Sequence, residues 1–221
     1  MLAATPLPAS PARAARLARL GGLYALVGGA DPIAQAAEAL DGGAGVLQLR
    51  VKEGGDAALL EVATRLVALA RGRALVIVND RADLAVLSGA DGVHVGDDDL
   101  PVEAARRVAG PDLLVGRSTR TLAGGLAALA AGADHVGFGP VFATSTKQIA
   151  EPPRGLAMLA EVARALPAPV VAIGGIGLAT IGPVAAAGAA AAAVIGALFD
   201  APDPRERAAA LAAAFAAGRA R

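Results

Sequence analysis

One short segment of this chain combines the residue types that bind phosphate. Three residues separate the apolar run at 135–140, which has the composition of a buried strand, from Thr144, Ser145, Thr146 and Lys147. Hydroxyls, a lysine and the backbone N–H groups of a turn are the donors that a phosphate accepts hydrogen bonds from. A surface loop needs polarity but not this particular set, so the segment indicates a phosphate site.

A second group of long polar side chains lies at the end of another apolar run. Gln48, Arg50 and Lys52 alternate along the chain, and residues i, i+2 and i+4 of a strand point to the same side. If that side is buried, these groups need partners or ligands. One explanation is an ion pair between Arg50 and a carboxylate such as Asp80; the other is that the cations bind an anionic ligand.

Acidic residues follow the next two apolar runs. Asp80 comes directly after Asn79, and Asp99 ends the sequence Gly-Asp-Asp-Asp. Each has a structural explanation, because Asp80, Asp99 and also Ser118 could cap the helices expected after them. Alternatively, Asp80 and Asp99 hold a divalent cation such as Mg²⁺, which takes one or two carboxylates together with phosphate oxygens of the substrate.

The elements that must position these residues alternate regularly along the chain. Eight short and continuously apolar runs are rich in β-branched residues, as is typical of strands buried on both faces of a parallel sheet. Each is followed by a segment of helical period, and most of these segments end in glycine, as helices do. The expected strands are 22–29, 45–50, 74–80, 92–97, 113–118, 135–140, 169–175 and 191–198.

Eight strand–helix units in 221 residues predict the fold. We expect an α/β chain forming a single (β/α)8 barrel over 21–221, preceded by a short surface helix within 1–20 that Ser10 caps. A doubly wound open sheet is the alternative, but no Gly-x-Gly-x-x-Gly follows the first strand. Barrel active sites lie at the C-terminal ends of the strands, which is where the polar residues above are found.

Two further strand ends complete this arrangement. The seventh run ends in Gly174 and Gly175, and the eighth contains Ile195 and Gly196. Backbone N–H groups after strands seven and eight frequently form a phosphate site in such barrels. Together with the cations of the second strand, this indicates two anion sites, for two phosphorylated substrates or one large one.

The overall composition disfavours several classes of partner. The formal net charge is zero and aromatic residues make up 2%, so there is no basic surface or stacking platform for nucleic acid and none for an anionic membrane. The uncharged segment at 169–199 is long enough to span a membrane, but glycines and Pro183 interrupt it. The N-terminus lacks the apolar core of a secretory signal, so we expect a cytoplasmic protein; a homo-oligomer is left open.

Five segments carry a recognisable family pattern. They are GVLQLRVKEG, IVNDRADLAVLSGADGVHVGDDDLP, VGRSTRT, GADHVGFGPVFATSTK and PVVAIGGI, in order over about 23–199. Together they resemble the thiamine phosphate synthase family. The resemblance implies a barrel transferase that uses Mg²⁺ and two small-molecule substrates: the nitrogen of a phosphorylated thiazole attacks the methylene carbon of hydroxymethylpyrimidine diphosphate, and pyrophosphate leaves.

The resemblance also implies a role for each candidate residue. Gln48 and Ser118 would contact the pyrimidine, and Tyr24 is a weaker candidate for the wall of its site. The catalytic residues would be those on its diphosphate, namely Arg50, Lys52, Asn79 and Lys147, while Asp80 and Asp99 would hold magnesium. The thiazole phosphate would be bound by Thr144, Ser145, Thr146, Gly175, Ile195 and Gly196. No protein nucleophile is required, and we expect His94 and His135 to be buried and neutral.

Three positions depart from the family pattern. Asp97 stands where glutamine is usual and would add negative charge near the metal, Gly196 replaces a common serine, and Arg120 stands where histidine is frequent. The last change bears on the nearest alternative, the thiazole tautomerase (TenI) relatives, which share the barrel but lack the full loop at 144–147. A barrel that binds a phosphorylated ligand without turnover is another alternative, although it has no need of two metal-binding carboxylates.

Overall fold

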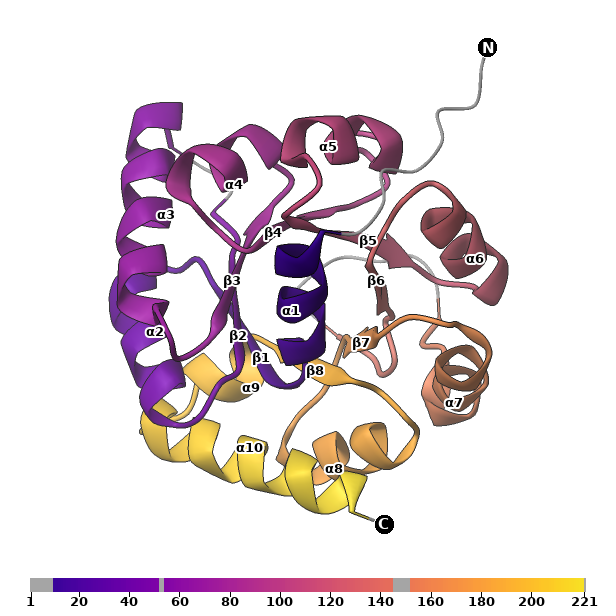
Figure 1. Cartoon of the computed structure of the whole chain (residues 1–221). Coiled ribbons are helices and arrows are strands. Elements are labelled where there is room, and N and C mark those ends of the chain that lie inside the picture. The colour runs from indigo at the N-terminus through magenta and orange to yellow at the C-terminus, as the bar shows by residue number, and fades with distance from the viewer. Residues whose placement is uncertain (1–9, 52–53, 145–151, 221) are drawn as a thin grey trace.

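Eight parallel strands form a closed barrel in the computed structural model of the chain, which describes residues 10–51, 54–144 and 152–220 (Figure 1). Neighbouring strands pair in chain order, and β8 pairs with β1. The strands are β1 (Gly22–Val27), β2 (Val46–Leu49), β3 (Leu75–Asn79), β4 (Gly92–Val95), β5 (Leu114–Thr119), β6 (His135–Phe138), β7 (Val170–Ile173) and β8 (Ala191–Val194). The predicted (β/α)8 barrel is confirmed.

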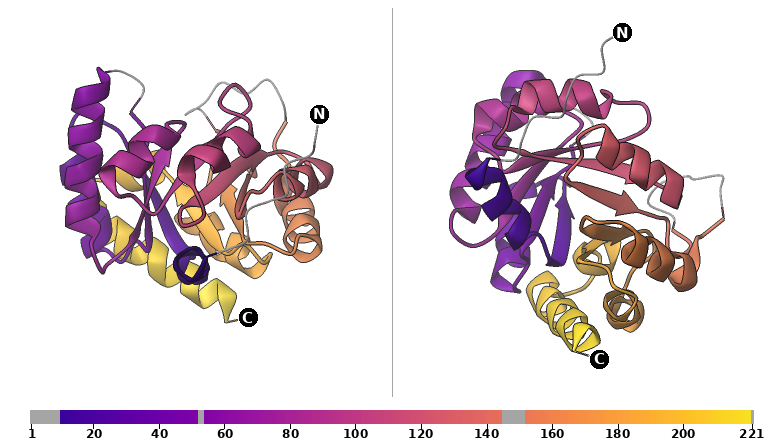
Figure 2. Two further views of the ribbon diagram at one scale, coloured as in Figure 1. Left: turned by 45° about the horizontal axis from the view of Figure 1, so that its top comes forward. Right: turned by 45° about the vertical axis from the view of Figure 1, so that its right-hand side comes forward.

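Helices cover the outside of the strands, as the turned views of Figure 2 show. The described helices, including α1 at the end of the barrel, are α1 (Pro11–Arg19), α2 (Pro32–Asp41), α3 (Asp56–Ala70), α4 (Ala82–Ser88), α5 (Val102–Ala109), α6 (Leu122–Ala130), α7 (Gly155–Ala165), α8 (Leu178–Ala186), α9 (Gly196–Phe199) and α10 (Pro204–Arg219). The expected last strand, 191–198, was too long, because its second half forms α9. None of the described helices has the length and apolar character needed to cross a membrane.

Side chains alternate between two sides of the sheet, and on most strands each side joins its own apolar core. On β1, Leu23, Ala25 and Val27 join the cluster between the barrel and its helices, whereas Tyr24 and Leu26 join the cluster inside the barrel. Both sides are largely buried, so most strand residues are apolar and polar residues do not alternate regularly with them. The period of two nevertheless decides which residues face the interior, and it therefore decides which side chains can reach a site there.

Helix α1 closes the barrel at the N-terminal ends of its strands, in front of them in Figure 1. It was expected to be a surface helix; Ser10 does cap it, accepting from the N–H of Arg13 at 3.1 Å. However, Leu17 and Leu20 pack onto the cluster inside the barrel, with Leu20 only 6% exposed. Because this end is filled, the interior opens to solvent at the opposite end, where the strands finish.

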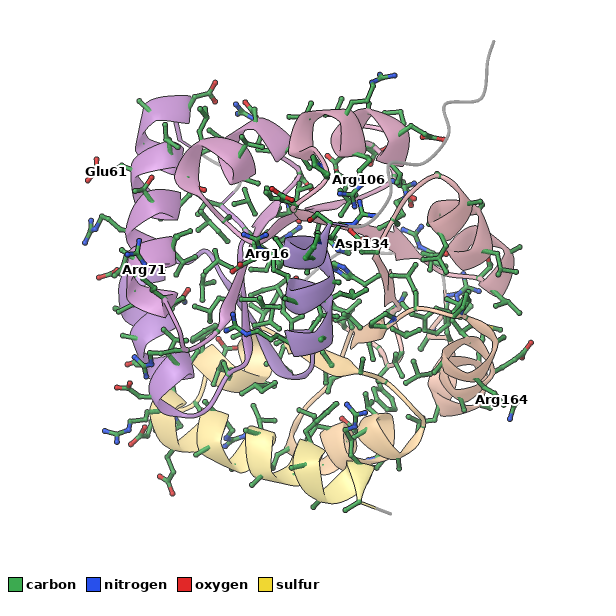
Figure 3. All side chains as sticks on the ribbon, viewed as in Figure 1. Arg16, Glu61, Arg71, Arg106, Asp134 and Arg164 are labelled. Carbon is green, nitrogen blue, oxygen red and sulfur yellow. The ribbon has the colours of Figure 1, made fainter. Side chains whose placement is uncertain are left out.

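A buried ion cluster holds α1 in place. Asp134, which precedes β6, pairs with Arg13 of α1 at 3.3 Å and also with Arg106 of α5, and it accepts from the N–H of Val115 at 2.8 Å. Figure 3 shows Arg106 and Asp134 beside α1. Both acid and cations are nearly inaccessible to water, so each depends on its partners for stabilisation.

Replacing Asp134 with asparagine should therefore destabilise the protein strongly. The change leaves two buried guanidinium groups without their carboxylate, which typically costs about 3 kcal/mol or more in free energy of unfolding. Asp41→Asn is the matched control, because Asp41 pairs with Arg73 at the surface, where such pairs contribute little. Urea denaturation measures both, and equal losses in the two variants would contradict a supporting role for the buried cluster.

Candidate active site

A cavity of about 640 Å³ lies at the C-terminal ends of the strands. All candidate residues within the described part of the chain line this cavity, and they come from all around the barrel. They are Tyr24, Gln48, Arg50, Asn79, Asp80, Asp99, Ser118, Thr144, Gly175, Ile195 and Gly196. Lys52, Ser145, Thr146 and Lys147 lie outside the described residues. The predicted convergence on one rim is thus observed for the described candidates, while their individual roles remain predictions.

Two neighbouring strands place a tyrosine and a glutamine inside the barrel. Gln48 of β2 is 5% exposed, and its Nε2 donates to the hydroxyl of Tyr24 on β1 at 2.8 Å. Burial raises the pKa of Tyr24 above its usual value, so the phenol stays neutral. The bond fixes the orientation of the Gln48 amide at the floor of the cavity.

Across the barrel a histidine contacts the candidate serine. His94 of β4 lies with its Nε2 3.0 Å from the hydroxyl oxygen of Ser118 on β5. Burial, with a smaller effect of Arg117, lowers the pKa of His94 to about 4, so the ring is neutral as expected. Unlike His135, which is fully buried, His94 borders the cavity. The sequence interpretation missed this, although a histidine between Val93 and Val95 must point inward when both valines point outward.

The ion-pair explanation for Arg50 is not supported. No ion pair joins Arg50 to Asp80 among the described residues, and both line the cavity. Asp80 adopts a φ of 65°, a left-handed conformation that is uncommon outside glycine and is enriched at functional sites. Its N–H donates to the carbonyl of His94 at 2.8 Å, which ties the end of β3 to β4.

The capping explanations are wrong for all three residues that they covered. Helices α4, α5 and α6 have Arg81, Pro101 and Thr121 at their N-caps, not the residues proposed from the sequence. Asp99 instead accepts from the N–H of Gly96 at 2.7 Å, within its own loop. Ser118 belongs to β5 and faces the cavity. Helix capping therefore explains neither the two acids nor the serine.

The two carboxylates suit a magnesium ion that arrives with a phosphorylated substrate. The described residues contain no group of three or more His, Cys, Asp or Glu side chains that could hold a metal by themselves. Asp80 and Asp99 nevertheless line one cavity, and Mg²⁺ commonly takes one or two carboxylates with water and phosphate oxygens for the rest. The oxygen donors present fit this mode of binding and do not form a complete protein cage.

Two of the three departures from the family pattern contact each other. One carboxylate oxygen of Asp97 accepts from Arg117 at 2.8 Å and the other accepts from Arg120. Arg117 also donates to the carbonyl of Gly96, so β5 holds the loop that carries Asp99. Asp97 therefore carries its negative charge beside two guanidinium groups, and its effect on a nearby metal stays a prediction.

The glycines after β7 permit close contact with the chain that follows β6. Gly175 has a φ of 63°, and a Cβ atom there would lie 2.2 Å from the carbonyl oxygen of Ala143. A Cβ atom at Gly196 would lie 2.6 Å from a carboxylate oxygen of Asp200, so a serine there requires that this exposed side chain move. The end of β7 thus lies against the segment leading to Thr144.

Fold and site together define a (β/α)8-barrel enzyme whose cavity combines cationic, acidic and glycine-rich strand ends. The model of the thiamine monophosphate synthase family matches residues 23–198. The chain belongs to this family.

Named relatives agree with this assignment. Thiamine-phosphate synthase of Anaeromyxobacter dehalogenans is 65% identical over 215 residues, covering 97% of each chain. The enzyme of the same name from Myxococcus xanthus is 51% identical over 186 residues, 84% of this chain and 85% of that one. The solved structure of thiamine phosphate pyrophosphorylase from Pyrococcus furiosus superimposes with a TM-score of 0.84 at 34% identity, covering 90% of this chain and 97% of that one.

The cluster of Asp97 with its two arginines predicts a measurable coupling. In a double-mutant cycle of Asp97→Asn and Arg120→Gln, we expect the pair to contribute about 0.5 kcal/mol to the free energy of unfolding at low salt, since both groups are partly exposed. The coupling should fall in 1 M NaCl, because salt screens such pairs. Strictly additive effects at low salt would show that the two side chains do not interact in solution.

Proposed function

We propose that this chain is a thiamine phosphate synthase. It would join hydroxymethylpyrimidine diphosphate to the phosphorylated thiazole, forming thiamine phosphate and releasing pyrophosphate. The observation that carries the proposal is the gathering of Arg50, Asn79, Asp80 and Asp99 at one end of a single cavity, in a chain of this family. A cytoplasmic location and a homo-oligomeric state stay predictions from the sequence.

Departure of the diphosphate is the step that needs most help from the protein. The methylene C–O bond breaks and its electron pair leaves with the pyrophosphate, so negative charge grows on the phosphate oxygens. Arg50 and the amide of Asn79, together with Lys52 and Lys147, would bind those oxygens in fixed positions and stabilise the charge without reorganisation. Asp80 and Asp99 would hold Mg²⁺, which when bound neutralises part of the same charge.

No protein nucleophile is needed for the second half of the reaction. The amino group of the pyrimidine can share the positive charge left on the methylene carbon, and the lone pair of the thiazole nitrogen then forms the new C–N bond. The chain is consistent with this route because it has no cysteine, His135 is fully buried, and the Nε2 of His94 is engaged with Ser118 at 3.0 Å. Gln48 and Ser118 would hold the pyrimidine ring from opposite sides of the barrel.

The thiazole phosphate would be bound where backbone and hydroxyl donors meet. Thr144 and the strand ends at Gly175, Ile195 and Gly196 line the same cavity, and Ser145 and Thr146 would extend this group. Backbone N–H groups after the seventh and eighth strands are a recurrent phosphate site of this fold. The thiazole nitrogen would then face the methylene carbon between the two anion sites.

Pyrophosphate release distinguishes this function from its alternatives. An assay with the pyrimidine diphosphate, the thiazole phosphate and Mg²⁺, each omitted in turn, should release pyrophosphate only in the complete mixture, with thiamine phosphate as product. A tautomerase or a non-catalytic binder would release none, and that result would reject the proposal.

Arg50→Ala should remove activity without unfolding the protein. We expect kcat/KM to fall about 100-fold or more, the usual loss when one preorganised charge-stabilising donor is removed, while the free energy of unfolding stays nearly unchanged. Arg65→Ala, an exposed change on the neighbouring helix α3, should alter neither quantity. A parallel loss of stability in Arg50→Ala would instead favour a structural role.

Asp80→Asn should weaken metal binding together with turnover. Calorimetry with Mg²⁺ and pyrophosphate measures the first without any reaction, and a loss of about tenfold or more in affinity is expected for the removal of one charged ligand. Asp83→Asn is the matched control, because that carboxylate pairs with Arg81 at the surface. Unchanged Mg²⁺ affinity in Asp80→Asn would exclude a ligand role for Asp80.

A further inference from the structure

His94 and Ser118 occupy neighbouring strands in a staggered arrangement. In the β4–β5 register His94 lies opposite Gly116, and Ser118 comes two residues later on the same side of β5. The imidazole therefore lies one step deeper in the barrel than the hydroxyl. Its Nε2 is 3.0 Å from the Ser118 oxygen, so the ring supports the serine from below.

Two glycines create the space that the imidazole fills. A Cβ atom at Gly116 would lie 2.5 Å from Nδ1 of His94 and 2.3 Å from Nε2 of His135, and one at Gly137 would lie 3.0 Å from Cε1 of His94. The ring thus packs directly on the backbone of β5 and β6. This packing holds His94 in one position, as a supporting residue requires.

The surroundings of the ring decide which of its nitrogens carries the proton. A neutral imidazole has one N–H donor and one acceptor. Nδ1 of His94 is buried and has no hydrogen-bond partner in the described part of the chain. A proton there would leave a buried donor unsatisfied, which costs more than leaving an acceptor without a donor. The proton on Nε2 is favoured instead, because it can be donated to Ser118.

The tautomer fixes what the serine can offer to a ligand. If Ser118 accepts a hydrogen bond from His94, its own O–H is not used on the histidine, and no other partner is recorded for it among the described residues. Since Ser118 lines the cavity, that proton points to whatever the cavity holds. At the floor of the site, the hydroxyl of Ser118 then acts toward a ligand as a hydrogen-bond donor and not as an acceptor.

We propose that His94 is a positioning residue that donates from Nε2 to Ser118 and thereby directs the serine hydroxyl to an acceptor nitrogen of the bound pyrimidine ring. The inference rests on the proposed function for the identity of the ligand. It assigns to His94 no contact with the reacting atoms; the histidine acts through the serine.

The same arrangement recurs on the opposite side of the barrel. Tyr24 lies opposite Val46 in the β1–β2 register, and Gln48 comes two residues later on β2. Gln48 donates to the Tyr24 oxygen at 2.8 Å. In both pairs a deeper side chain on one strand orients the cavity-facing polar group of the next strand. The repetition supports a positioning function, because ordinary core packing requires neither pair.

The protonated nitrogen can be identified directly by NMR. The chain has two histidines, so long-range ¹H–¹⁵N correlation of histidine-labelled protein shows two rings, which His135→Gln or the shift caused by Ser118→Ala assigns. We expect the Nε2–H tautomer for His94 in the free enzyme. The Nδ1–H tautomer would overturn the proposal, because Ser118 would then donate to the histidine.

Kinetics tests whether His94 acts through Ser118. Glutamine can place an amide N–H near the position of Nε2, whereas the shorter asparagine cannot, so His94→Gln and His94→Asn form a matched pair. We expect His94→Asn to raise the KM for the pyrimidine diphosphate about tenfold, the effect of one lost hydrogen bond, and to leave the KM for the thiazole phosphate unchanged. His94→Gln should recover most of this loss.

The Ser118→Ala background separates this role from a structural one. There, His94→Asn should have no further effect on the KM for the pyrimidine diphosphate, because the group it positions is gone. Additive losses, or equal increases in both KM values, would overturn the proposal. If the wild-type protein released no pyrophosphate at all, the proposed function would fail, while the tautomer of His94 would still decide the hydrogen-bond assignment.

Discussion

Closure of the parallel sheet is the constraint on which the rest of the structure depends. Every strand is paired on both edges, so no strand can slide by one residue without breaking its register with two neighbours and exchanging its inward-facing and outward-facing side chains. The same register sets which residues of each strand face inward, and it brings the ends of all eight strands to one rim. A site composed of single residues from many strands is possible because this register is fixed.

Polar groups inside such a barrel must satisfy one another before they can bind a ligand. Gln48 and Ser118 are each held by a neighbour, Tyr24 and His94 respectively, since an unsatisfied buried group is costly. The donors and acceptors of Gln48 and Ser118 that these bonds do not use face the cavity. The hydrogen-bond pattern offered to a ligand is therefore decided by the deeper partners as much as by the lining residues themselves.

The sequence predicted those features that depend on local period and missed those that depend on tertiary pairing. The alternation of side chains along one strand predicted that Gln48 and Arg50 face the same side, and both line the cavity in the structure. His94 was assigned correctly as neutral, but one polar residue in an apolar strand does not reveal which side chain it contacts. The pairing of Asp97 with Arg120 spans two loops, so the sequence alone does not reveal that these two departures contact each other.

The arginines at this end of the barrel differ in whether a carboxylate of the described chain pairs with them. Arg117 and Arg120 both pair with Asp97, so one carboxylate offsets part of their combined positive charge and holds both side chains in place. Arg50 also lines the cavity, yet no described carboxylate pairs with it. A cation that pairs with no carboxylate in the described part of the chain gains more from an anionic ligand than one that is already paired. Asp97 thus engages two arginines of the rim, which is consistent with the proposal that Arg50 is the described cation that binds the diphosphate.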